Sequence, residues 1–423
     1  MWLPVVAYKT GAMRKVQTLF FDMNSYFASV WQAEEPSLRG RPVGVVTTLS
    51  AGAACIAASL EAKKTGVKVG TRTQEAQQLC PDIVFRPALH DMFVSYHHRI
   101  KAAVDTVLPI DKTHSVDEFS CRLMGTQQDL DTALQIGRDL QAAILTQVSP
   151  ALRSSVGVAP NKLLAKIAAE LEKPMGLNWL LPEVLPDRIS HLRCDQLPGI
   201  SKGMLRRLDA AGIVDIPMLY HLPPKQARHI WRSVEGERFV RQLRGETVVP
   251  PPIKHSSLGH GQQLTAPNRS PRAARLVARR LLIKAASRLR RENGCAQALS
   301  ISVKCKIHGR QSAGGALQAT QDTFQLLRIF NAFWDTMNIT APFSVAVMLS
   351  DLVAKPDRIP DLFAAQTSAG MDAREDLCLQ IDKLNQKFGQ NTIRFGELPP
   401  HHVPFTGAKI AFGRVPDKED FRE

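Results

Sequence analysis

The sequence predicts an α+β protein of several domains, and three observations lead to this fold class. Apolar runs typical of buried strands alternate with helical patterns through residues 16–178. A basic, mainly helical stretch follows at 194–245, and three consecutive prolines at 250–252 then indicate a stiff linker. Beyond them, a long basic helix is predicted ahead of further strands. This mixture makes the N-terminal part an α/β or an α+β catalytic domain.

Each predicted element rests on its own apolar periodicity. Residues 16–33 predict a strand and then a helix, and residues 155–169 repeat that order. Between them we expect a strand at 41–48, a short helix that ends at Gly66, and helices at 91–107 and 129–147. After the linker we expect a helix from Arg269, strands at 298–307 and 343–349, and a last helix at 376–388.

The composition points to a polyanionic partner. The 423 residues carry 54 Lys and Arg against 39 Asp and Glu, a net charge of +15, and residues 269–310 alone hold +11 of it. The seven cysteines are scattered without a C-x-x-C pair, which argues against a zinc ribbon or disulfide scaffold and for a reducing compartment. No apolar run predicts a membrane span and residues 1–17 do not resemble a signal peptide, so we expect a cytoplasmic protein.

Two acidic stretches carry the chemistry. The apolar run from Leu19 ends in Asp22, and Asp117 and Glu118 stand side by side in a strand-like run. Alone, Asp22 could be a turn residue, and the adjacent pair could lie on a solvated edge, because neighbours in a strand point to opposite faces. A bulge or a strand end can turn one of them toward the same site. Together, three carboxylates on two neighbouring strands are what a two-Mg²⁺ phosphoryl-transfer site needs.

Basic residues supply three further candidate surfaces. Lys162 and Lys166 lie one helical turn apart behind Asn161, which suits a phosphate group, although a solvated face is the alternative and no P-loop pattern is present. The stretch 197–208 resembles a helix-hairpin-helix, whose turn presents N–H groups to a DNA phosphate, but an ordinary helix–helix turn fits equally well. In the basic segment, a DNA-backbone surface or a solvated face could be formed by Arg272, Arg275, Arg279, Lys304 and Lys306.

At this point the residues resemble a known family. The blocks Asp22-Met23-Asn24-Ser25-Tyr26-Phe27, Ser115-Val116-Asp117-Glu118 and Asn161-Lys162-Leu163-Leu164-Ala165-Lys166 are similar, in this order, to the signature blocks of Y-family translesion DNA polymerases, the ImpB/MucB/SamB group. The likeness runs from about residue 16 to 395. Within the family, residues 56–63 and 379–395 look more like the UmuC type than the DinB type.

The resemblance implies a right-hand polymerase, and we expect its parts along the chain. They are a palm at 16–33 and 89–178, small fingers at 34–88, a thumb with the hairpin motif at 179–248, a linker at 249–256, a DNA-binding little finger at 257–355, and a C-terminal tail at 356–423. The tail lacks the residues for a large core of its own, so parts of it are expected to be disordered.

The resemblance also assigns residues. It implies that Asp22, Asp117 and Glu118, helped by the Met23 carbonyl, bind two Mg²⁺ ions that Mn²⁺ can replace. Phe27 would exclude a ribose 2′-OH, Ile56 would cover the nascent base pair, and Lys166 and Lys63 would hold the triphosphate. Gly199, Ile200 and Ser201 would contact DNA. Leu60 and Lys63 stand where many relatives have Tyr and Arg, so the grip on the triphosphate could differ. Trp31 also departs from the family pattern, since it replaces a common Glu.

The expected partners are primer–template DNA, a dNTP and a sliding clamp, with a UmuD-like accessory protein and a recombinase as further candidates. The clamp peptide would be Ile359, Asp361, Leu362 and Phe363, although its leading Gln is missing. Two other functions stay open. A non-catalytic polymerase-like scaffold would not need the three carboxylates, and a structure-specific nuclease or glycosylase would have no use for Phe27 or the lysine helix.

Overall fold

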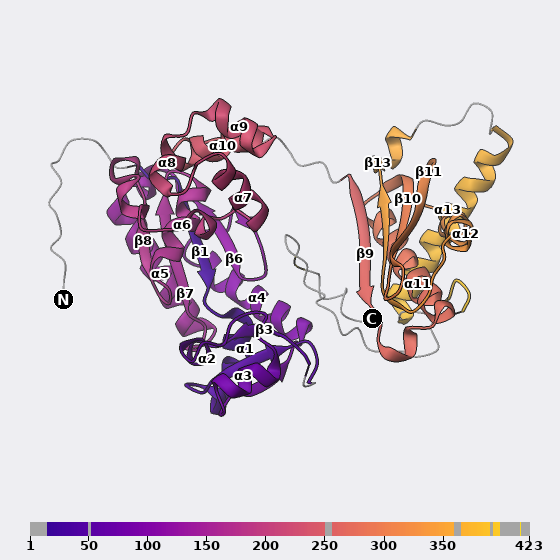
Figure 1. Cartoon of the computed structure of the whole chain (residues 1–423), viewed down its shortest axis with the longest axis horizontal. Helices are drawn as coiled ribbons and strands as arrows, with labels where there is room; N and C mark the ends of the chain where they lie inside the picture. The colour runs from indigo at the N-terminus through magenta and orange to yellow at the C-terminus, as the bar shows by residue number, and fades with distance from the viewer. Residues whose placement is uncertain are drawn as a thin grey trace. The chain divides into compact units, whose positions relative to one another are not determined.

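The computed structural model describes residues 15–49, 52–249, 256–358, 365–389, 392–397 and 415. These residues divide into two compact units, one formed by residues 15–249 with Val415 and the other by residues 256–397 (Figure 1). Both units combine helices with sheets, which confirms the predicted α+β fold class. Among the described residues, none of the helices is long and apolar enough to cross a lipid bilayer.

A five-stranded sheet forms the centre of the first unit, in the order β5-β6-β1-β7-β8. Its strands are β1 (Thr18–Met23), β5 (Lys112–Thr113), β6 (Glu118–Arg122), β7 (Ser154–Ala159) and β8 (Leu177–Trp179). The middle strand β1 runs antiparallel to both of its neighbours. The helices that pack on this sheet are α4 (His90–Asp105), α5 (Leu130–Gln147) and α6 (Lys162–Leu171). This is the region predicted as the palm.

Side chains of β1 alternate between two separate cores, and this alternation decides where the acidic residue of the strand lies. Leu19 and Phe21 belong to the core that contains α4 and α5, whereas Phe20 belongs to the core that contains α6. Asp22 follows Phe20 by two residues and therefore lies on the α6 face, at the end of the strand.

The contact between α6 and β7 is close enough to require a glycine. A Cβ on Gly157 would lie 2.0 Å from the Ala165 carbonyl oxygen and 2.4 Å from the Ala169 nitrogen. Because neither backbone can move without displacing the helix, this position sets how near α6 comes to the acidic end of β1.

A second, smaller sheet of three strands occupies the region predicted as the fingers, in the order β3-β2-β4. The elements here are β2 (Val43–Val46), β3 (Cys55–Ala58), α2 (Leu60–Lys64), α3 (Thr73–Leu79) and β4 (Val84–Pro87), and they follow α1 (Tyr26–Glu34), which the sequence assigned almost entirely to the palm. The indole N–H of Trp31 in α1 donates to the Pro87 carbonyl oxygen at 3.0 Å, and the Arg86 guanidinium lies over the same ring. Trp31 thus attaches this sheet to the helix that follows Asp22.

Four short helices form the region predicted as the thumb: α7 (Lys202–Ala210), α8 (Ile216–His221), α9 (Pro224–Trp231) and α10 (Val234–Leu243). Their apolar side chains share one core with α6. The Asn161 side chain joins the two parts, because its oxygen accepts from the Leu164 N–H and its amide donates to the Gln242 and Glu246 carbonyls at 2.8 and 2.9 Å. The predicted helix cap is therefore also a bond to the thumb.

The second unit is built on a four-stranded sheet in the order β11-β10-β12-β9, with a short β13 beside β10 (Figure 1). Its strands are β9 (Ser257–Gln263), β10 (Gly294–Cys305), β11 (Gly309–Thr320), β12 (Pro342–Ser350) and β13 (Val353–Ala354). Helices α11 (Pro271–Arg291) and α12 (Thr323–Asp335) cover one face, where Leu299, Ile301 and Val303 of β10 pack against them.

A third helix, α13 (Ala365–Phe388), also belongs to the second unit and packs on α11 and α12. Its Glu375 is fully buried and pairs with Arg358 at 2.9 Å and Lys355 at 3.3 Å. Its Asp382 forms a two-pronged pair with Arg290 of α11 at 2.7 and 3.0 Å. These ion pairs hold the helix that was predicted at 376–388 against the second unit, which therefore extends beyond residue 355.

Two predicted segments fall wholly or largely outside the described residues. They are the linker, at 250–255, and the clamp peptide with Ile359, Asp361, Leu362 and Phe363.

Candidate active site and nucleic-acid surfaces

Two of the predicted carboxylates meet at the adjoining ends of β1 and β6. Asp22 and Glu118 are directly opposite one another in the antiparallel pairing, so both side chains project from the α6 face of the sheet. Asp22 is 8% exposed and Glu118 is half-buried. The alternation of β1 and the register of β6 are thus sufficient to bring these two residues together.

The third carboxylate, Asp117, lies in the turn that precedes β6. The Ser115 hydroxyl contacts the Asp117 carboxylate, and its oxygen accepts from the N–H groups of Asp117 and Glu118 at 3.3 and 3.0 Å. The Asp117 carbonyl oxygen accepts from the Met23 N–H at 3.0 Å. Because Asp117 precedes the regular strand, it escapes the alternation that would turn two adjacent strand residues to opposite faces.

Two lysines stand against these carboxylates. Lys173 Nζ lies 2.9 Å from Asp22 Oδ1 and 2.7 Å from Glu170 Oε1, whereas Lys166 Nζ lies 2.6 Å from Glu118 Oε1. The predicted site contained Lys166 but not Lys173. Lys173 follows the end of α6, outside the quoted motif, and only the packing of α6 along β1 places it on Asp22.

Burial raises the pKa values of two of these carboxyl groups. It raises the pKa of the Asp22 carboxyl to about 7, with Glu170 and Asp117 adding to the rise and Lys173 opposing it. Burial also raises the pKa of Asp117, with the nearby Glu118 charge contributing to the rise. A cation placed among these groups would lower both pKa values, because it would favour the ionised forms.

The donor set fits a hard divalent cation in its chemistry. Carboxylate oxygens and a backbone carbonyl are the ligands that Mg²⁺ prefers, and the cations paired with Asp22 and Glu118 here are Lys173 and Lys166. In the described part of the chain, no group of three or more His, Cys, Asp and Glu side chains is gathered as a preformed metal cage. Mg²⁺ is usually held by a few carboxylates together with water and substrate phosphates.

Three of the predicted nucleotide-binding residues lie in α1, β3 and α2. Phe27, in the first turn of α1, is half-buried, and its ring stacks on Phe93. Ile56 of β3 is half-buried against the core that contains β1. Burial lowers the pKa of Lys63, and the nearby Lys173 charge lowers it further. Lys63 and Lys173 therefore form one basic group beside Asp22.

Lys166 lies in a different environment, among other basic groups on the Glu118 side. Its ammonium is 5.6 Å from the centre of the Phe20 ring, on which His114 also stacks. Burial lowers the pKa of His114 to about 4, and the charges of Lys162, Lys112 and Lys166 add to this effect. The two lysines predicted as a phosphate site, Lys162 and Lys166, thus lie near Glu118, whereas Lys63 and Lys173 lie near Asp22.

The predicted hairpin of the thumb has the expected local geometry. Gly199 adopts a φ of +91°, which favours glycine, and Ile200 is buried in the thumb core. The Ser201 side chain accepts from the Met204 N–H and so caps α7. The turn before α7 is thereby fixed, although its role as a DNA contact stays a prediction.

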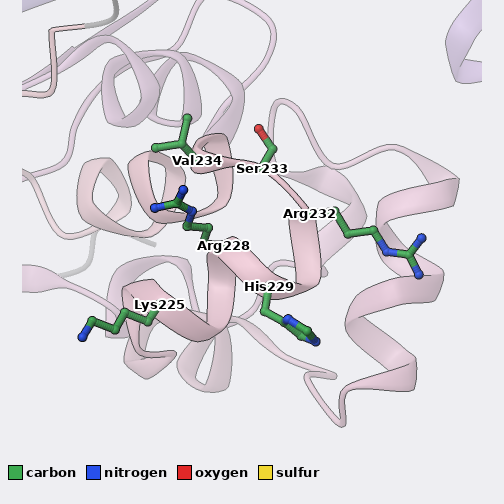
Figure 2. A pocket seen from close by; sticks show the side chains of 6 residues that line it. All are labelled: Lys225, Arg228, His229, Arg232, Ser233 and Val234. Carbon is green, nitrogen blue, oxygen red and sulfur yellow. The ribbon is translucent and has the colours of Figure 1, made fainter.

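The thumb has a second basic feature that the sequence analysis missed. Figure 2 shows a pocket between the end of α9 and the start of α10, lined by Lys225, Arg228, His229, Arg232, Ser233 and Val234. Ser233 caps α10 by accepting from the Glu235 N–H. Basic side chains beside a helix N-terminus favour an anion. The sequence predicted a basic stretch here, but it did not show that these residues line one pocket.

The sheet of the second unit has one face without a helical cover among the described elements. Lys304 lies on this face, since it alternates with the buried residues of β10, and Arg310 of β11 pairs directly across from it. The exposed Lys306 follows the end of β10. Met348 and Gln263 also lie on this face, and its other positions carry small side chains, among them Ser300, Ser302, Ser312, Gly314, Ser344, Ala346, Gly259 and Gly261. Small side chains flanked by cations permit close approach of a polyanionic backbone.

The three arginines predicted to bind DNA already have partners within the second unit. Arg272 pairs with Glu397 at 3.1 Å, and Arg275 pairs with Asp335 at 2.8 Å. Arg279 donates to the Phe395 carbonyl oxygen at 2.6 Å. The contacts of Arg272 and Arg279 attach the segment after α13 to α11, and that of Arg275 joins α11 to α12. All three lie on the helical side of the sheet rather than on the face that carries Lys304. A DNA-binding role for the three arginines is untested.

Comparisons with known proteins give the family. Residues 21–170 match the impB/mucB/samB family, and residues 255–362 match the impB/mucB/samB family C-terminal domain. The chain is 30% identical over 413 residues to a DNA polymerase IV of Moorella thermoacetica, covering 93% of this chain and 98% of the relative. It is 27% identical over 388 residues to DNA polymerase IV 1 of Bacillus subtilis, covering 89% and 91%. These names give no support to the UmuC type over the DinB type.

Solved structures give the same fold. A Y-family DNA polymerase chimera of Dbh and Dpo4 superimposes with a TM-score of 0.65 at 20% identity, over 80% of this chain and 99% of that chain. An insertion ternary complex of Dbh DNA polymerase gives a TM-score of 0.54 at 21% identity with the same coverage. At such identities the likeness supports the fold alone. Together with the relatives, it places the chain in the impB/mucB/samB family of DinB-like Y-family DNA polymerases.

Proposed function

We propose that this Y-family DNA polymerase performs translesion synthesis, adding deoxynucleotides to a primer 3′-OH opposite damaged template. The observation that carries the proposal is the convergence of Asp22, Asp117 and Glu118 at the adjoining ends of β1 and β6. A scaffold without catalysis would gain nothing from gathering three acidic groups there, since desolvation and the repulsion between like charges both disfavour ionised carboxylates. A nuclease or glycosylase would leave Phe27 and the lysines beside Asp22 without a role.

The carboxylates would hold two Mg²⁺ ions, with the Met23 carbonyl as a further ligand and Mn²⁺ as a possible replacement. Bound there, the ions would activate the primer hydroxyl and neutralise charge on the triphosphate. Lys173 and Lys63 are placed to bind the triphosphate, because both lie at the Asp22 end of the site. Lys173 would then exchange its contact with Asp22 for one with phosphate oxygens.

The remaining residues would hold the substrates in register. Phe27 would stand beneath the sugar and exclude a ribose 2′-OH, and Ile56 would cover the nascent base pair. Small fingers with a single aliphatic side chain over that pair would tolerate damaged bases at the expense of fidelity. In the thumb, the Gly199 turn and the pocket at Arg228 would bind backbone phosphates, and in the second unit the face with Lys304 and Arg310 would do the same.

The biological setting is proposed from this chemistry. A polymerase of this kind would serve DNA-damage tolerance, including an SOS response, and would act on the chromosome in the cytoplasm. A sliding clamp, a UmuD-like accessory protein and a recombinase remain candidate partners.

The test is primer extension on undamaged and abasic templates with Mg²⁺ and dNTPs. The wild-type protein should extend both primers, and the variant with Asp117→Ala and Glu118→Ala should extend neither while still binding DNA. If both proteins bind DNA and neither extends, with clamp and accessory proteins present as well, the scaffold function would replace this proposal.

A further inference from the structure

The ring that is expected to select the sugar is itself held by a second ring. Phe27 stacks on Phe93 with their ring centroids 4.4 Å apart and their planes inclined by 30°. Phe93 is fully buried in α4, whereas Phe27 is only half-buried at the start of α1. The packing therefore supports Phe27 from the protein side and leaves its other side open.

Phe93 is fixed by contacts that reach beyond its own ring. The Tyr26 hydroxyl donates to the Phe93 carbonyl oxygen at 2.6 Å, so the residue next to Phe27 is bound to the same point of α4. The His90 ring meets the Phe93 ring edge-on at 6.2 Å. One turn further along α4, His97 Nδ1 forms a hydrogen bond with the Val116 carbonyl oxygen at 2.8 Å. Hence α4 contacts both the predicted sugar gate and the turn that carries Asp117.

We infer that Phe93 is a positioning residue for sugar selection, and that it acts by holding the Phe27 ring against rotation. This inference rests on the proposed function, in which Phe27 excludes the 2′-OH. A side chain excludes an extra hydroxyl only while it cannot move aside, and a half-buried phenylalanine at a helix start has other rotamers available. Stacking on an immobile ring removes those rotamers, because each would forfeit the aromatic contact.

The inference differs from an ordinary core role in what it predicts for catalysis. A residue that only supports the fold would change reactions with dNTPs and rNTPs by the same factor. A residue that holds the gate changes their ratio and acts only while the Phe27 ring is present.

The test measures kcat/KM for dCTP and for CTP opposite the same template guanine. The variants are Phe93→Leu, Phe93→Met, Phe27→Ala and the double variant Phe27→Ala/Phe93→Leu. Phe93→Met keeps most of the side-chain volume but loses the planar ring, so it serves if Phe93→Leu does not fold. Ile100→Val is the matched control, since Ile100 is also fully buried in α4 but lies about two turns from Phe93.

We expect Phe93→Leu and Phe93→Met to lower the preference for dCTP over CTP by about five- to tenfold, through better use of CTP. Ile100→Val should leave the preference unchanged. Phe27→Ala should lower it further, and adding Phe93→Leu to Phe27→Ala should produce no additional change.

Two results overturn the inference alone. In one, Phe93→Leu and Phe93→Met reduce the use of dCTP and CTP equally. In the other, Phe93→Leu lowers the preference as much in the Phe27→Ala background as in the wild type. If Phe27→Ala itself keeps the wild-type preference, the gate assignment fails and the inference with it. A wild-type protein that incorporates no dCTP refutes the proposed function first.

Discussion

Replacing Asp382 with alanine should lower the free energy of opening α11 in the second unit, and the size of the effect follows from the burial of Arg290. The Arg290 side chain is fully buried, and its Nε and Nη2 donate to the Asp382 carboxylate at 2.7 and 3.0 Å. Its Nη1 also donates to the Gln321 carbonyl and the Thr323 hydroxyl, and these two bonds remain in Asp382→Ala. The variant therefore leaves one buried guanidinium half satisfied.

Removing one partner of a buried ion pair costs about 3–5 kcal/mol. The Asp382 side chain is 23% exposed, so water can reach part of the vacated position and the lower end of that range applies. We expect a loss of about 3 kcal/mol in the free energy of opening α11, which corresponds to roughly 150-fold faster amide exchange. Hydrogen exchange of the full-length protein, followed by mass spectrometry, measures this for residues 271–291.

Glu292→Ala is the control, because Arg288 and Glu292 form a pair four residues apart at the end of α11 in which the Glu292 side chain is 42% exposed. The free energy of opening α11 should fall by only about 0.3–0.5 kcal/mol in this variant, which corresponds to about a twofold change in the amide exchange rate. Exchange in Asp382→Ala that matches the control would show that α13 does not hold the charge of Arg290, and the account of this helix as part of the second unit would be wrong.

Three other predictions concern phosphate binding and pH. Lys173→Ala removes the ammonium beside Asp22, so KM for dNTP should rise about tenfold with unchanged DNA affinity, as steady-state kinetics and anisotropy would show. Lys225→Ala/Arg228→Ala should reduce the slope of log K against log salt for duplex binding by about 2, since two phosphate contacts are lost; an unchanged slope would exclude the pocket. Burial lowers the pKa of His97 to about 4, so the unfolded chain binds its proton first. The free energy of unfolding should therefore fall by about 3 kcal/mol between pH 6.5 and pH 4. Urea unfolding of the His97→Gln variant should show a smaller fall over the same range.

The sequence was sufficient wherever a local pattern decides the structure. The apolar run before Asp22 predicted a buried strand, and the Asn161 cap predicted the start of α6. The presence of three carboxylates on two strand-like runs predicted their meeting, although only the register of β1 with β6 explains why Asp22 faces Glu118. The sequence also predicted that a bulge or a strand end could turn one of Asp117 and Glu118 toward the shared site, and the turn at Ser115 is such a strand end.

The sequence was insufficient where partners lie far apart in the chain. Nothing in the residues around Lys173 links that lysine to Asp22, because the contact depends on how α6 packs along β1. Arg272, Arg275 and Arg279 formed a basic stripe in the sequence, but their acceptors lie on α12 and in the segment after α13. Glu375 gave no signal of burial, since a buried carboxylate is recognised only when its cationic partners are known.

The measurement that tests the central claim most directly is the single-turnover rate of dNTP incorporation in Asp22→Asn, Asp117→Asn and Glu118→Gln, each with saturating DNA and a Mg²⁺ titration. Asp139→Asn is the control, because Asp139 is an exposed residue of α5. If the three carboxylates form one site, each single variant should lose most of the rate, on the order of 10³-fold, and pairing two changes should add little. Near-normal rates in any one of the three, or losses that simply multiply in the pairs, would contradict a shared site.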